Sequence, residues 1–75
     1  MLDQLTTYYY FVKKAEYARR KKDYEELLSD LHKYLDVLSD DYANLLCKYI
    51  INLTKNKYKS KSLKELRNFC NSFIY

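Results

Sequence analysis

The sequence predicts a small all-α protein, an antiparallel four-helix bundle that forms a single domain over residues 1–75. Two observations lead to this fold. The chain contains no glycine and no proline, which disfavours β-hairpins and phosphate-binding loops because their turns depend on those residues. Apolar residues also recur at helical spacing in four segments that short polar connections join.

The first helix is expected over residues 3–21, with Asp3 as its N-cap. Successive helical residues lie about 100° apart, so the aromatic run at residues 8–11 cannot face one core. The sequence pattern assigns Tyr8 and Tyr9 to the core, Phe11 to its margin and Tyr10 to the opposite face. The predicted apolar stripe consists of Leu5, Tyr8, Tyr9, Val12 and Ala15.

The second helix is expected over residues 24–38, with Asp23 as its N-cap. Its apolar stripe is the clearest in the chain and comprises Tyr24, Leu27, Leu28, Leu31, Tyr34, Leu35 and Leu38. No glycine or proline forces a turn before it. A single bent helix over residues 3–38 is therefore an alternative to two separate helices.

The third helix is expected over residues 40–54, where Ser39 caps the helix and Asp40 and Asp41 complement its positive N-terminal end. Its stripe is Tyr42, Leu45, Leu46, Tyr49, Ile50 and Leu53. A polar connection, KNKYKSK at residues 55–61, follows it. The fourth helix is expected over residues 63–74, with Ser62 and Glu65 at the spacing of a capping box. Its stripe is Leu63, Leu66, Phe69, Cys70, Phe73 and Ile74.

Charge and composition indicate how compact the protein is and where it is located. Residues 1–22, 23–47 and 48–75 carry net charges of +4, −6 and +6, and attraction between these segments favours a compact bundle. The abundance of Lys, Asn, Tyr, Ile and Leu indicates an AT-rich genome. The longest uncharged runs are far shorter than the roughly 18 residues of a membrane span, and the N-terminus lacks the pattern of a signal peptide. The expected location is cytoplasmic.

No catalytic, cofactor-binding or metal-binding residue is predicted, and an enzyme is not expected. The single histidine, His32, is placed on an exposed helix face near Glu25 and Asp36, which has no pocket to hold a metal. Cys47 and Cys70 have no CxxC partner and are expected to be buried free thiols. They lie equally far from the middle of the 55–61 connection, so an antiparallel helix pair would bring them close together.

Two surfaces are candidates for binding. The first, for a protein partner, combines tyrosines and basic residues of the first helix, which give large contact area at low entropic cost: Tyr10, Lys13, Lys14, Tyr17 and Lys21. The alternative is a nucleic-acid surface made by two basic runs: Arg19, Arg20, Lys21, Lys22, Lys55, Lys57, Tyr58, Lys59 and Lys61. A further alternative is a structural homodimer closed through the first helix.

Residues 34–75, which contain the polar 55–61 connection, the pattern SLKEL at residues 62–66 and a C-terminal aromatic residue, resemble the small four-helix-bundle bacteriocin-immunity proteins of lactic-acid bacteria. This resemblance implies a cytoplasmic protein that acts stoichiometrically by binding another protein. Antitoxin-like proteins and inhibitors or adaptors encoded by phages or plasmids belong to the same functional class.

Overall fold

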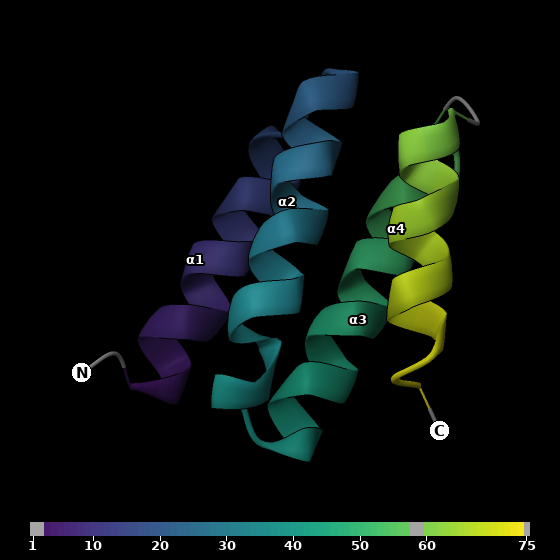
Figure 1. Ribbon diagram of the computed structural model, residues 1–75. Coiled ribbons are helices and arrows are strands. Elements are labelled where there is room, and N and C mark those ends of the chain that lie inside the picture. The colour runs from purple at the N-terminus through teal and green to yellow at the C-terminus, as the bar shows by residue number, and fades with distance from the viewer. Residues whose placement is uncertain (1–2, 58–59, 75) are drawn as a thin grey trace.

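The computed structural model of the protein describes residues 3–57 and 60–74, and in these ranges all regular structure is helical. The helices are α1 (Gln4–Tyr17), α2 (Lys21–Tyr34), α3 (Asp40–Thr54) and α4 (Lys61–Asn71), with a short 3₁₀ turn, η1 (Leu35–Val37), between α2 and α3. The predicted all-α bundle is confirmed (Figure 1).

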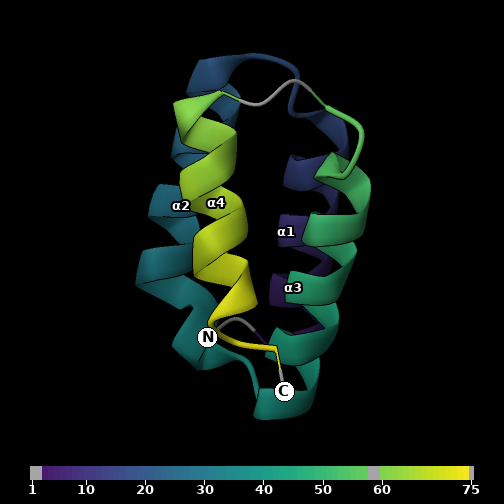
Figure 2. The same cartoon turned by 90° about the vertical axis from the view of Figure 1, so that its right-hand side faces the viewer.

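The bundle consists of two helical hairpins, α1–α2 and α3–α4, that pack side by side (Figures 1 and 2). Each helix runs antiparallel to the next one in the chain. Between the hairpins, α1 packs against α3 and α2 against α4, while α1 and α2 approach each other less closely than these pairs do. The α1–α2 turn, the end of α3 and the start of α4 therefore share one end of the bundle.

Side-chain caps begin three of the helices. The Asp3 carboxylate accepts a hydrogen bond from the Thr6 N–H (2.7 Å), and the Ser39 hydroxyl accepts one from the Tyr42 N–H (3.4 Å), as predicted. The prediction for α4 was wrong by two residues. Ser60 is the cap (3.1 Å to the Leu63 N–H), whereas Ser62 is buried in the bundle and donates a hydrogen bond to Glu25 (3.1 Å).

The first two helices are separate, so the alternative of one bent helix does not hold. α1 ends at Tyr17, before its predicted end at residue 21, and Ala18 and Arg20 adopt extended backbone conformations. Asp23 is not the N-cap of α2. It is the third helical residue, and its carboxylate accepts hydrogen bonds from the N–H groups of Arg19 (3.0 Å) and Arg20 (3.1 Å), which lower the pKa of Asp23. The buried Tyr24 hydroxyl donates a hydrogen bond to the Ala18 carbonyl (3.2 Å), which stabilises the α1–α2 turn on its inner side.

Two other helix ends also differ from the prediction. The segment 24–38 is not one α-helix, because α2 ends at Tyr34 and the chain continues through η1 to an extended Leu38. α4 ends at Asn71 rather than residue 74 and leaves Phe73 exposed. Of the four helices, α3 alone has its predicted bounds, because the Ser39 cap and a polar connection delimit it.

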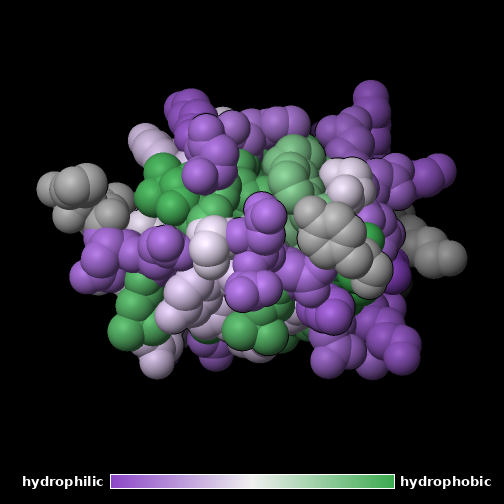
Figure 3. Space-filling view, turned by 90° about the horizontal axis from the view of Figure 1, so that it is seen from below, coloured by the Kyte–Doolittle hydropathy of each residue, from purple (hydrophilic) through white to green (hydrophobic). Residues whose placement is uncertain are grey.

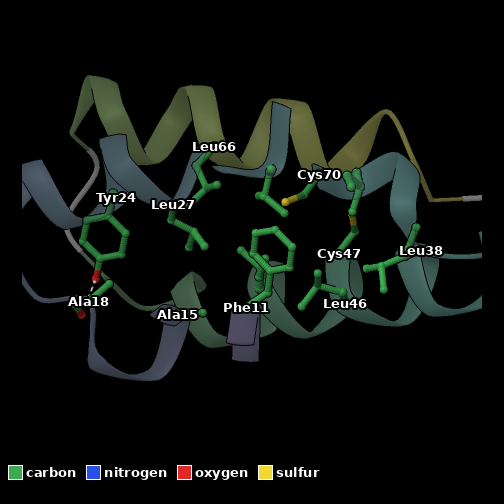
Figure 4. Packing of buried hydrophobic residues seen from close by; sticks show 14 of the residues in the cluster. Phe11, Ala15, Ala18, Tyr24, Leu27, Leu38, Leu46, Cys47, Leu66 and Cys70 are labelled. Atoms are coloured by element: carbon green, nitrogen blue, oxygen red, sulfur yellow. Dashed lines mark hydrogen bonds between the residues drawn. The ribbon is translucent and has the colours of Figure 1, made fainter. Parts of the chain in front are cut away.

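The predicted face of α1 was right only in part, because Ala15 is buried and Tyr8 and Val12 pack against the core, but the centre of the face differs. Phe11 is fully buried at the centre of the core (Figure 4), whereas Tyr9 and Leu5 have exposed fractions of 56% and 51%. The buried face of α1 is Thr7, Phe11, Ala15 and the following Ala18, rotated by about one residue, or roughly 100°, from the predicted stripe. Thr7 tolerates burial because its hydroxyl donates to the Asp3 carbonyl (3.0 Å).

The other helices supply most of the remaining core, although single positions deviate. Leu27, Leu31, Leu46, Ile50 and Leu66 are fully buried, as predicted. Tyr34 and Leu45, which the sequence assigned to apolar stripes, are exposed. In both cases the residue lies at the edge of its stripe, where no neighbouring helix covers it.

The two cysteines meet inside the core, as their positions predicted (Figure 4). Both are fully buried and are free thiols, as predicted. The hydrogen bond with Cys47 raises the pKa of the Cys70 thiol, and burial raises it further. The same hydrogen bond lowers the pKa of the Cys47 thiol, so it is the burial of both sulfurs that keeps them from reagents in solvent.

Phe11→Ala should lower the free energy of unfolding by about 3–5 kcal/mol, because it removes a fully buried ring from the core. Tyr9→Ala is the matched control, and it should change stability by about 0.5 kcal/mol or less because its ring is exposed. Urea denaturation followed by circular dichroism measures both values. Equal costs for the two variants would contradict the observed face of α1.

Alkylation of the cysteines should be slow in the native protein and fast after denaturation. If reaction requires global opening with a free energy of about 5 kcal/mol, the native rate should be roughly 5000-fold lower. Iodoacetamide labelling with intact-mass detection, with and without urea, gives the two rates. Rapid labelling of one thiol in the native state would show that its surroundings open locally.

Candidate functional site

The predicted protein-binding residues gather along a surface groove between α1 and α2, with a volume of about 560 Å³. We call it the α1–α2 groove. Four of the five predicted residues line it, namely Tyr10, Lys13, Lys14 and Tyr17, and the sequence did not identify Tyr9 and Glu26 as further lining residues. The fifth, Lys21, lies elsewhere because the chain leaves the helix at Ala18 and Lys21 begins α2.

The groove exists because α1 and α2 separate more than the other neighbouring helices and because small Ala18 contributes to its lining. Tyr17 and Tyr9 present the most exposed rings of its lining, with exposed fractions of 70% and 56%. Their spacing of eight residues places them on the same side of α1. The surface is thus rich in aromatic area without being part of the core.

Tyr10 is less free than its exposure suggests, because a polar cluster holds it between the two helices. Its hydroxyl donates to the Asp30 carboxylate (2.8 Å), and the Lys14 ammonium donates to the same carboxylate oxygen (2.6 Å) and to the Tyr10 hydroxyl (3.1 Å). Lys14–Asp30 is also the salt bridge that links α1 to α2. The sequence could not show this cluster, because its members are 16 and 20 residues apart.

The cluster shifts the pKa of both charged groups. Partial burial alone would raise the pKa of Asp30, but the hydrogen bonds from Lys14 and Tyr10 outweigh it and hold the pKa below its usual value. The hydrogen bond with Asp30 raises the pKa of Lys14, and the one with Tyr10 adds to this. Both groups are therefore charged over the whole neutral range.

The residues of the nucleic-acid alternative converge only in part. Arg19 and Lys21 meet Lys57 in a pocket of about 400 Å³ at the end of the bundle. Lys57 also lines a second hollow, a groove of about 680 Å³ along α4, together with Lys61. We call these two connected hollows the basic groove. Arg20, Lys22 and Lys55 do not line it, and Tyr58 and Lys59 lie outside the described residues.

Lys64 and Arg67 also line the basic groove, although the sequence did not identify them. The signal that could have revealed them is their spacing, because Lys61, Lys64 and Arg67 follow one another every three residues along one side of α4. The predicted basic surface ended at Lys61, whereas the positive charge continues along α4 to Arg67.

The opposite end of the bundle has the opposite charge. It contains the start of α1, the α2–α3 connection and the end of α4, and it carries Asp3, Asp36, Asp40 and Asp41. Viewed from this end, apolar and polar side chains alternate over the surface (Figure 3). The bundle is therefore polarised along its length, with a basic end and an acidic end.

His32 is exposed, as predicted, and it also contacts α4. Its ring packs on Phe69 of α4, with 4.3 Å between ring centroids. Within residues 3–57 and 60–74, no group of three or more His, Cys, Asp or Glu side chains is arranged to hold a metal ion. The described helices are also all too short or too polar to cross a lipid bilayer.

Asp30→Asn should lower the free energy of unfolding by about 1 kcal/mol at neutral pH, because Lys14 and Tyr10 lose a charged acceptor. The folded-state pKa of Asp30 is depressed, so the stabilisation is present above its unfolded pKa of about 4. It is lost as the pH falls through the folded-state pKa. Urea denaturation at a series of pH values should therefore show the wild type and the variant converging below about pH 4.

Asp36→Asn is the control for this experiment, because Asp36 is an exposed carboxylate for which the structure shows no ion pair. It should change stability by about 0.5 kcal/mol or less. A difference between wild type and Asp30→Asn that stays constant down to acid pH would contradict a stabilising charge at Asp30.

No family model, no curated protein and no solved structure matches this chain. The resemblance of residues 34–75 to the bacteriocin-immunity proteins therefore stays a prediction. What the molecule can bind follows from the chemistry of its two grooves: one aromatic and bordered by charges of both signs, the other basic.

Proposed function

We propose that this chain is a small non-enzymatic protein-binding module that acts stoichiometrically through the α1–α2 groove. An immunity or antitoxin-like protein, or an inhibitor or adaptor encoded by a phage or plasmid and acting in the cytoplasm, would work in this way. The observation that carries the proposal is the exposure of Tyr9 and Tyr17 beside a groove of about 560 Å³. Large rings that a core does not use are the side chains that most often dominate protein interfaces.

The groove suits an amphipathic helix of the partner. A furrow between two helices accepts the apolar face of a third helix, as in helix-in-groove recognition. Lys13 borders the groove on the α1 side and Glu26 on the α2 side. A partner helix with apolar residues along its centre, an acidic residue toward Lys13 and a basic residue toward Glu26 would match both borders.

The Lys14–Asp30 salt bridge supports this use of the groove. It joins the two helices, with Lys14 in the lining of the groove, and Asp30 also holds Tyr10 in one position. A groove whose walls are already fixed loses less conformational entropy on binding. The partner would therefore meet a preorganised surface in which Tyr9 and Tyr17 are the free contacts.

A homodimer is the second candidate for the same groove. Because Lys13 and Glu26 border opposite sides, two copies related by a two-fold axis would pair Lys13 of each copy with Glu26 of the other. The two candidates differ in oligomeric state, which light scattering measures directly.

Tyr9→Ala combined with Tyr17→Ala should weaken partner binding by about 30-fold or more, since each ring of a binding hot spot contributes at least about 1 kcal/mol. The matched control is Tyr34→Ala with Val37→Ala, two apolar residues of similar exposure (45% and 47%) that do not line the groove. Tagged wild type and both variants serve as baits in lysate of the source cells. Calorimetry on the purified pair then gives affinity and stoichiometry.

The expected result is one partner per chain, retained by the wild type and the control and lost by the groove variant. Equal retention by all three baits would contradict the proposed groove. Light scattering at high protein concentration distinguishes a homodimer from a monomer. A dimer of the wild type that dissociates in the Tyr9/Tyr17 variant would show that the groove binds a second copy of the chain rather than a different protein. Thermal melts verify that both variants remain folded.

A further inference from the structure

Two basic runs that are more than thirty residues apart in the sequence meet at one end of the bundle. Arg19 and Lys21, from the α1–α2 turn and the start of α2, line the same pocket as Lys57, which follows α3. Figure 2 shows the α1–α2 turn and the start of α4 at this end. The topology of the bundle thus joins charges that the sequence separates.

The pocket opens into the groove along α4, since Lys57, Ser60 and Leu63 line both hollows. Lys61, Lys64 and Arg67 extend the positive charge over about 9 Å of helix. Together the two hollows present six cationic side chains: Arg19, Lys21, Lys57, Lys61, Lys64 and Arg67. Among the described residues that line them there is no carboxylate.

Two carboxylates near the start of α2 are already engaged inside the protein. Asp23 accepts hydrogen bonds from two backbone N–H groups of the α1–α2 turn. Glu25 accepts a hydrogen bond from Ser62, and Lys21 lies 3.9 Å from the same oxygen. The remaining cations of the groove make no ion pair in the described part of the chain, so their charge is available to an external anion.

Other features of the groove also favour a phosphate ligand. The N-terminus of α4 lies at the groove, where Ser60 and Lys61 line it, and contributes partial positive charge. Asn68 and Asn71 add amide groups that can donate hydrogen bonds to phosphate oxygens. Lys57 is held over the Tyr24 ring, 5.8 Å from its centroid, which positions one cation where the two hollows join.

We propose that the basic groove binds the phosphodiester backbone of single-stranded nucleic acid. The groove is concave and has a volume of about 680 Å³ along α4, on a molecule of only 34 × 24 × 17 Å. A flexible single strand can follow such a hollow, whereas a duplex is nearly as wide as the protein itself. The described residues that line the groove offer charges and amides, and the one ring among them, Tyr24, is buried. This part of the groove can therefore contact phosphates without reading the base sequence.

Fluorescence anisotropy with labelled oligo-dT and oligo-U of about 20 nucleotides tests the proposal, with a DNA duplex of equal length as a third arm. Binding should weaken with salt between about 50 and 200 mM, with a slope of log K against log salt of about −0.7 per phosphate contacted. Lys61→Glu with Lys64→Glu should reduce the steepness of this slope by about 1.4 and weaken binding at low salt by roughly tenfold or more.

Lys33→Glu with Lys48→Glu is the matched control, because both lysines are exposed, lie outside the basic groove and change the net charge equally. This control should keep nearly the wild-type affinity. Circular dichroism melts verify that both variants fold.

Tighter binding of oligo-dT or oligo-U than of the duplex, lost only in the groove variant, supports the proposal, and the two oligomers distinguish DNA from RNA. No binding at low salt, or equal weakening by both variants, would overturn it. So would tighter binding of the duplex. Displacement of the oligonucleotide by polyglutamate as readily as by unlabelled oligonucleotide would also overturn it, in favour of an acidic protein.

Discussion

Every reversal of direction in this chain has to be made without glycine or proline. Among the residues that the structure describes, none adopts a positive φ angle. Each helix instead begins after a residue with extended backbone: Asp3, Arg20, Ser39 and Ser60. Polar side chains then satisfy the free N–H groups, as Asp23 does for the α1–α2 turn. The turns are therefore polar by necessity, and much of the charge of the protein collects at the two ends of the bundle.

The topology of the bundle places the basic and the acidic residues at opposite ends. The basic residues flank the α1–α2 turn and the start of α4, which share one end, and the acidic residues flank the start of α1 and the α2–α3 connection at the other. Asp40 and Asp41 also lie in the first turn of α3, where they favour helix formation. The same charges thus assist folding and leave two distinct surfaces: an aromatic groove along the side and a basic groove that begins at one end.

The two grooves were not equally accessible to sequence reasoning. Tyr10, Lys13, Lys14 and Tyr17 could be grouped because they lie on one helix, where spacing fixes which residues share a face. Asp30 and Glu26 belong to the neighbouring helix, and nothing in the spacing of α1 indicates which residues of α2 it meets. The Lys14–Asp30 bridge, which makes Tyr10 part of the framework rather than a free contact, could be recognised only from the packed hairpin.

The sequence alone determined that the chain is helical and where α3 begins and ends. It also determined which residues of the clearest stripes face inward, because an amphipathic stripe with capped ends has one stable way to be buried: Leu27, Leu31, Leu46, Ile50 and Leu66. The face of α1 was decided only by tertiary packing. Apolar rings at residues 8–11 and Val12 surround that helix, so several rotations bury similar area. The hollow between α3, α4 and α2 accepts Phe11 and the small residues in line with it, and that fit turns Tyr9 out to the surface.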